Sequence, residues 1–218
     1  MFKYFLTFVI ILGLYACSTN KVKQKENFNA GIIYGKGHAF FLTAPKGWVL
    51  DNSSGVSHGL HAVFYLEGNS WSNGTSVMYA NTTLKEIQGD EPVEKVIEGD
   101  ISRFKANSPN LNVIDAAPLL TRDNKKCIVK YFSGDIHGNY EAVAYIDERK
   151  VVVMIVLTSR KKEEFDLSLP AFKELVASYQ FITDDVRIEK WVPKIIGIDR
   201  RHCSNKAETG QSHEGFGY

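Results

Sequence analysis

The sequence lacks a charge excess and a cysteine framework, and both absences limit its function. Lys and Arg number 26 against 25 Asp and Glu, so the formal net charge is +1. Nucleic-acid-binding domains usually carry a basic patch, so this balance gives no electrostatic case for such a partner. The three cysteines, Cys17, Cys127 and Cys203, lie far apart and predict no disulfide framework. A bridge between Cys127 and Cys203 remains open, since an oxidising compartment permits one.

Long apolar runs are also scarce. The clearest one covers residues 5–14, after a single positive charge at Lys3. It is too short to span a bilayer, which takes about 20 apolar residues. A charged start, a short apolar stretch and a small residue before a cleavage point are typical of a secretory signal. We therefore expect residues 1–16 to be an export signal.

The run ends at Leu14-Tyr15-Ala16-Cys17, which resembles the bacterial lipobox. The resemblance implies cleavage before Cys17 and a lipid on its sulfur, with further acylation of the new N-terminus. Two or three acyl chains on one residue suffice for stable anchoring without a membrane span. Ser18 follows the cysteine, which favours the outer membrane where the organism has one. The expected localisation is the cell envelope, with a folded part outside the cytoplasm and the lipid bilayer as a partner.

The chain divides by composition into four parts. After the signal, residues 17–30 hold the lipidated Cys17 and a polar, aperiodic tether. Residues 31–182 carry the alternating and helical patterns of one folded domain. Residues 183–218 form a C-terminal extension that is mostly polar. Removal of residues 1–16 takes away only Lys3, which leaves 25 basic and 25 acidic residues.

The domain predicts an α+β fold with an antiparallel sheet. Short apolar runs bounded by turn residues predict strands, at 31–34, 38–43, 48–50, 61–67 and 76–82. A helix is predicted to start at residues 90–92, and Asn107 and Ser108 end it. Four more strands are expected, at 111–120, 125–133, 140–146 and 150–158. Their connections are too short for parallel crossovers.

A second helix is predicted to begin at Ser168, with the serine as its cap and Pro170 in its first turn. Phe172, Leu175, Val176 and Tyr179 then follow at helical spacing and predict an apolar stripe. The expected core includes residues of the last predicted strand and of both helices, and its predicted members are Val153, Ile155, Phe104, Phe172 and Val176.

This order of elements, together with the early segment Ala44-Pro45-Lys46-Gly47-Trp48, resembles the PsbP-like family. That family is named for an extrinsic subunit of photosystem II, and it includes Mog-type proteins and bacterial lipoproteins of the DcrB type. The resemblance covers residues 38–182. It implies an antiparallel sheet with helices on both faces, an α/β/α sandwich, and a binding or assembly role without a shared catalytic motif or cofactor.

Few residues indicate chemistry. Gly55-Val56-Ser57-His58-Gly59 matches the Gly-x-Ser-x-Gly elbow of hydrolases, but that motif needs a helix after it and a strand is predicted here. His58 and His61 could form a metal pair, with His38 or His137 as further ligands. Zinc needs three or four convergent ligands, and a pair three residues apart specifies none, so no metal site is assigned. Glu91, Glu94, Glu98 and Asp100 predict a solvated acidic helix face.

Trp71 stands apart, because it lies in the polar loop at residues 67–74. Its ring either folds back on the domain edge or offers an exposed contact to a partner. The preferred function is a membrane-tethered, non-catalytic binding or assembly module of the envelope, with Trp71 in contact with an envelope protein or small ligand. The alternative is an envelope serine hydrolase that uses Ser57 and a nearby histidine.

Overall fold

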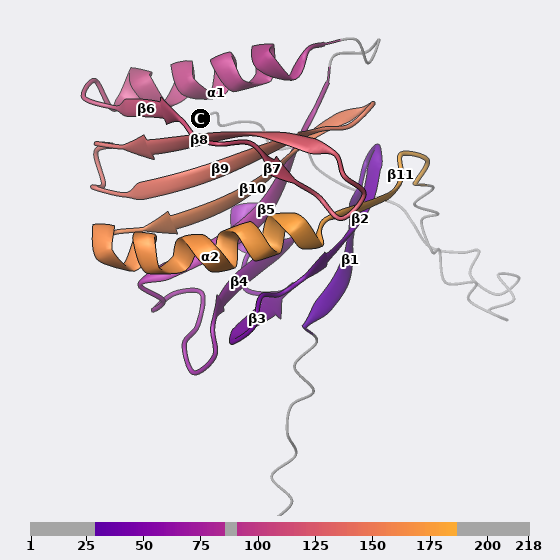
Figure 1. Ribbon diagram of the computed structural model, residues 1–218, viewed down its shortest axis with the longest axis horizontal. Coiled ribbons are helices and arrows are strands. Elements are labelled where there is room, and N and C mark those ends of the chain that lie inside the picture. The colour runs from indigo at the N-terminus through magenta and orange to yellow at the C-terminus, as the bar shows by residue number, and fades with distance from the viewer. Residues whose placement is uncertain (1–28, 86–90, 187–218) are drawn as a thin grey trace, which may run out of the picture. The chain divides into compact units, whose positions relative to one another are not determined.

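The computed structural model describes residues 29–85 and 91–186 (Figure 1), and the elements below belong to this part of the chain. In chain order they are β1 (Ala30–Gly35), β2 (His38–Thr43), β3 (Trp48–Asp51), the 3-10 turn η1 (Val56–His58), β4 (Ala62–Leu66), β5 (Ser76–Leu84), α1 (Val93–Asn107), β6 (Asn112–Asp115), β7 (Leu119–Leu120), β8 (Lys126–Ser133), β9 (Tyr140–Asp147), β10 (Val151–Ser159), α2 (Lys162–Ser178) and β11 (Gln180–Thr183). The signal at 1–16, Cys17 and most of the predicted tether lie outside the described residues.

The larger sheet has eight strands in the order β3-β4-β5-β10-β9-β8-β6, with β7 paired to β8 beside that path. Every neighbouring pair is antiparallel, which confirms the predicted α+β class. The register of β10 places Thr158 opposite Val77 of β5 and opposite Glu141 of β9. Because side chains on directly opposed residues share a face, these three side chains form one row across the sheet.

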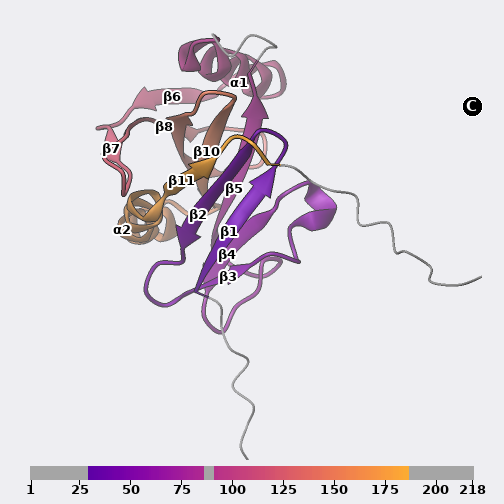
Figure 2. The same cartoon turned by 90° about the vertical axis from the view of Figure 1, so that its right-hand side faces the viewer.

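A second, three-stranded sheet holds β1, β2 and β11, which lie side by side in Figure 2. β2 is its middle strand and pairs antiparallel with both neighbours. The sequence predicted one sheet only, so the second sheet is a correction to that interpretation. β11 itself was not predicted, because a strand of four residues after a helix carries almost no periodic signal.

The two helices lie on opposite faces of the larger sheet (Figure 1). Against one face, α2 and the small sheet bury Phe40, Leu42, Phe172 and Leu175 with residues of β4, β5, β9 and β10. Against the other face, α1 buries Val93, Val96 and Ile97. Four of the five predicted core residues, Val153, Ile155, Phe172 and Val176, are fully buried, and Phe104 is half-buried against the α1 side.

The start of α2 differs from its prediction. The helix begins at Lys162, so Ser168 lies inside it as a buried residue and is no cap, and Pro170 is an interior residue. An interior proline removes one helical hydrogen bond, but Pro170 is exposed, where water can satisfy the freed carbonyl. Glu163 and Glu164 suit the first turn, and Phe165 extends the buried stripe by seven residues before Phe172. The buried apolar stripe, and not the local proline, therefore determines where α2 begins.

The predicted strand at 111–120 is divided in two. β6 and β7 both pair with β8, and the break between them contains Pro118. Proline has no N–H for a sheet hydrogen bond, so a continuous strand was the wrong prediction here.

Candidate functional site

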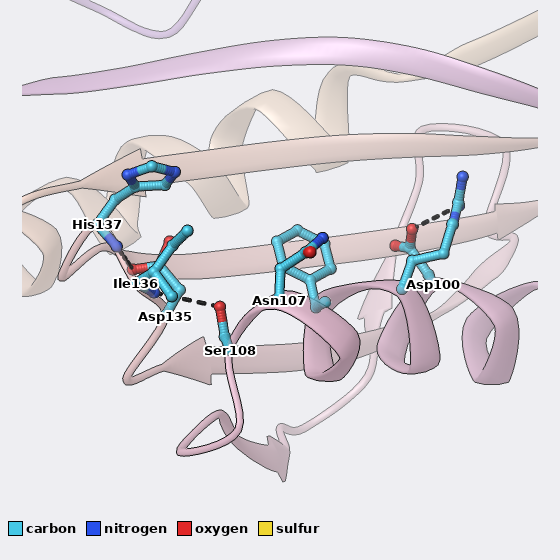
Figure 3. Close-up of a pocket in the computed structure, with 8 residues that line it drawn as sticks. Asp100, Asn107, Ser108, Asp135, Ile136 and His137 are labelled. Carbon is cyan, nitrogen blue, oxygen red and sulfur yellow. Dashed lines mark hydrogen bonds and ion pairs between the residues drawn. The ribbon is translucent and has the colours of Figure 1, made fainter.

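Two hollows lie on the α1 side of the larger sheet, and the smaller one is at the C-terminal end of α1 (Figure 3). Its volume is about 380 Å³. Residues of α1 form one wall, and the loop between β8 and β9 forms the other. They are Asp100, Arg103, Phe104, Asn107, Ser108, Asp135, Ile136 and His137.

Four polar side chains of this smaller hollow, those of Asp100, Arg103, Ser108 and Asp135, form hydrogen bonds within the protein. Asp100 accepts hydrogen bonds from Arg103 and from the hydroxyl of Tyr145, each at 2.8 Å. Asp135 accepts the backbone N–H groups of His137 and Asn139, and Ser108 Oγ accepts the N–H of Ile136 at 3.1 Å (Figure 3). These bonds hold the β8–β9 loop on the end of α1, so we assign this hollow a structural role.

The larger hollow has a volume of about 670 Å³, inside the range of roughly 300–1,000 Å³ common for small-molecule sites. We call it the Trp71 groove. Its lining comes from the β3–β4, β4–β5 and β8–β9 loops, from three neighbouring strands and from the connection between β10 and α2. The residues are His58, Leu60, Trp71, Ser72, Asn73, Gly74, Thr75, Val77, Tyr79, Asn81, Asn139, Glu141, Thr158, Ser159, Arg160 and Lys161.

The floor of the Trp71 groove is the row of Val77, Thr158 and Glu141, at the sheet end where β10 runs into α2. In β9, Ala142 and Ala144 face α2, so Glu141 and Val143 face the α1 side. α1 covers Val143 but leaves Glu141 at the edge of its cover, where Glu141 lines the groove. The part of this sheet face that α1 leaves uncovered is therefore the part that carries Glu141.

Glu141 is only 9% exposed. Burial, with a smaller contribution from the carboxylates of Asp135 and Asp100, raises the pKa of its carboxyl to about 7, although a hydrogen bond with Thr158 acts in the opposite direction. Thr158, which lies directly opposite Glu141 in the sheet, is the residue that hydrogen-bonds to this carboxyl. At neutral pH Glu141 thus exists in both protonation states and is able to donate as well as accept.

Trp71 stands on the wall of the groove, where its ring is partly folded back on the domain edge and partly exposed. It is half-buried, and its ring meets that of Tyr79 edge to face with the centroids 6.1 Å apart. The loop around it is compact, because Asn73 Oδ1 accepts the N–H of Ser70 and the N–H of Gly74 bonds to Ser70 O. The aromatic wall is thereby held in place before any ligand binds.

No known protein family matches the chain, and no curated protein matches it. Three solved structures are similar. PsbP from the cyanobacterium Synechocystis sp. PCC 6803 has 11% identity and a TM-score of 0.45, over 78% of this chain and 99% of that one. A protein from Bacteroides thetaiotaomicron VPI-5482 has 10% identity and a TM-score of 0.44, over 72% of this chain and 50% of that one. A Pseudomonas aeruginosa protein of unknown function has 11% identity and a TM-score of 0.37, over 67% and 92%.

These similarities concern the fold alone. The observed α+β arrangement, with antiparallel sheets and two helices, is the one that the resemblance of the sequence implied. Neither helix of the described part is long and apolar enough to cross a membrane.

The hydrolase motif is folded differently from a nucleophile elbow. Residues 56–58 form the short turn η1 between two strands, and Ser57 is exposed. A catalytic serine needs a base within hydrogen-bond reach, and within the described residues Ser57 has no side-chain hydrogen bond. Gly55 has a packing role, because a Cβ there would lie 2.6 Å from Val63.

The histidines weighed as metal ligands are scattered. His58 lines the Trp71 groove and His137 the smaller hollow, while His38 is buried in β2. Within the described ranges, no three His, Cys, Asp or Glu residues are grouped to hold a metal ion. Cys127 is buried, and burial raises the pKa of its thiol to about 12, so it suits an inert core role. Its suggested partner Cys203 lies outside the described residues.

Sequence reasoning placed Trp71 in a loop but missed Glu141. A signal for it exists in the sequence: a lone acidic residue interrupts the buried strand 140–146. A charge within a strand that is otherwise covered on both faces marks a gap in the cover. The acidic helix face also needs a correction at Asp100, whose carboxylate bonds to Tyr145 of the sheet.

Proposed function

We propose that this chain is a membrane-tethered, non-catalytic binding module of the bacterial cell envelope, and that the Trp71 groove is its binding site. The observation that carries the proposal is that a half-buried tryptophan and a buried carboxyl line the same groove of about 670 Å³. Ligand sites typically combine apolar surface with a few convergent polar groups.

The tether follows from the lipobox-like end at Cys17 and the polar residues after it. A lipid anchor with a polar linker keeps a domain near the membrane and raises its effective concentration for membrane-bound partners. The envelope protein or small ligand that the sequence led us to expect would then meet the groove at the membrane surface.

The test compares Trp71→Ala with Ser57→Ala in affinity capture from the native membrane of cells that carry the full chain. We expect Trp71→Ala to weaken capture of the specific partner by at least about 1 kcal/mol, because large aromatic side chains dominate binding hot spots. Circular dichroism checks that the fold is intact. Ser57→Ala should leave capture unchanged.

The opposite pattern contradicts the proposal. An esterase or peptidase activity of the purified protein that disappears in Ser57→Ala would establish the hydrolase alternative. Capture that is equal in wild type and Trp71→Ala would place the binding surface elsewhere.

A further inference from the structure

We infer that the Trp71 groove takes a neutral, polyhydroxylated ligand of the saccharide class. The inference rests on the proposed function and names the chemistry of its ligand. Three properties of the groove carry it: the kind of polar groups that line it, the balance of charge around it, and its aromatic wall.

Neutral polar side chains predominate in the lining, and their free atoms are of both kinds. Asn73 and Asn81 each use the side-chain oxygen to accept a backbone N–H, at 2.6 and 2.8 Å, which leaves their NH₂ groups as donors. Asn139 does the reverse: its Nδ2 donates to Asp135 at 3.0 Å, and its carbonyl oxygen remains as an acceptor. These internal bonds fix the orientation of each amide in advance.

The floor adds further acceptors. The Thr158 hydroxyl bonds to Glu141, and each of these groups retains acceptor capacity beyond that bond. The groove therefore presents oriented donors and acceptors together. A sugar hydroxyl donates one hydrogen bond and accepts others, so a row of hydroxyls matches such a mixed lining, whereas a ligand with acceptors alone leaves part of it unpaired.

Charge argues against an ionic ligand. Arg160 and Lys161 are exposed in the lining, whereas Glu141 lies buried at the floor. An anion deep in the groove would meet the Glu141 carboxyl, and a cation would meet the two basic side chains on entry. Burial of a charge that lacks a partner of opposite charge costs several kcal/mol. A neutral ligand therefore suits both the acidic floor and the basic entry of the groove.

The aromatic wall suits the apolar side of a sugar. Trp71 and Tyr79 are both half-buried and line the same groove. A pyranose ring carries its hydroxyls around the rim and C–H groups on its faces, so it offers an apolar face to an indole and polar edges to amides. Tryptophan supplies a large, rigid apolar surface for such a contact.

The experiment uses the purified full chain on an array of neutral, sulfated and uronic-acid-containing oligosaccharides, followed by calorimetry with the best neutral glycan as the probe. We expect binding of neutral glycans, at least a tenfold loss in Trp71→Ala, and a several-fold loss in Asn81→Ala, which removes one of the amide donors of the lining. Tyr34→Ala, an exposed aromatic of β1 outside the groove, is the matched control and should bind as wild type.

Three results would overturn the ligand class: no neutral glycan bound at millimolar concentration, equal binding by Trp71→Ala, or a preference for acidic glycans that Arg160→Ala abolishes. The two assays together also distinguish a wrong ligand class from a wrong binding site. If no glycan binds but Trp71→Ala still impairs partner capture, only the ligand class is wrong. If Trp71→Ala affects neither assay, the binding-site assignment is wrong as well.

Discussion

Replacement of Glu141 by Gln tests whether the floor of the groove holds a buried, titrating carboxyl. The amide has nearly the same shape and still accepts a hydrogen bond from Thr158, but it cannot ionise. In the folded protein, burial raises the pKa of Glu141 from 4.5 to about 7. One pKa unit corresponds to about 1.4 kcal/mol, so the ionised carboxyl lowers the free energy of unfolding by about 3 kcal/mol.

The direction in which stability changes with pH depends on whether the folded or the unfolded state binds the Glu141 proton more tightly. The folded state keeps the Glu141 proton up to about pH 7, whereas the unfolded chain loses it near pH 4.5. Stability therefore falls as the pH rises between these values. The cost is absent at lower pH and complete above pH 7. Glu141→Gln removes this cost. The free energy of unfolding of the variant, relative to that of wild type, should therefore rise by about 2.5 kcal/mol from pH 5 to pH 8.

Urea denaturation of both proteins at pH 5, 6, 7 and 8 measures this difference directly. Glu98→Gln, an exposed acid on α1, is the matched control and should differ from wild type by less than about 0.5 kcal/mol at every pH. A difference between Glu141→Gln and wild type that stays constant with pH would refute the reasoning, since it would mean that Glu141 titrates normally in the folded protein.

Three further predictions use other parts of the molecule. Phe172→Ala should lower the free energy of unfolding by roughly 3 to 5 kcal/mol, because Phe172 is fully buried in the α2 core; a loss under about 1 kcal/mol in denaturant would contradict that packing. Tyr145→Phe should cost about 1.5 to 3 kcal/mol, since it removes a hydrogen bond to the Asp100 carboxylate, and hydrogen exchange should show α1 opening more readily than α2. Cys17→Ser should leave unprocessed precursor or release the protein from the membrane fraction, and mass spectrometry that finds a mature, unmodified N-terminus elsewhere would contradict the lipoprotein prediction.

The strands and the first helix could be predicted because their signals are local. The short apolar run at residues 38–43 corresponds to β2 without any shift of its ends. The helical spacing from Val93 onwards likewise places α1, and Pro92 precedes its first residue. Short connections between the later strands also settle that they run antiparallel.

What could not be predicted depends on contacts between distant residues. Pro170 predicts a helix start locally, and only the packing of Phe165 beside Phe172 shows that the helix begins earlier. Neither residues 180–183 nor β2 carries a signal that pairs them. The Trp71 groove needs the β4–β5 loop, β9 and the connection between β10 and α2 together, so no single stretch of sequence contains it.

The pairing of β11 with β2 also has a consequence for how the chain reaches its folded state. Phe181 of β11 lies opposite Phe40 of β2. In the first hairpin of the described domain, β2 therefore lacks one of its two neighbouring strands until β11, the last strand, has been made. A chain synthesised from its N-terminus exposes one edge of β2 throughout that time, and an unpaired edge is a template for pairing with another chain. Contacts of such long sequence separation also slow folding. We therefore expect the β1–β2 hairpin to be the segment most dependent on a chaperone, which would cover the β2 edge until residues 180–183 have been made.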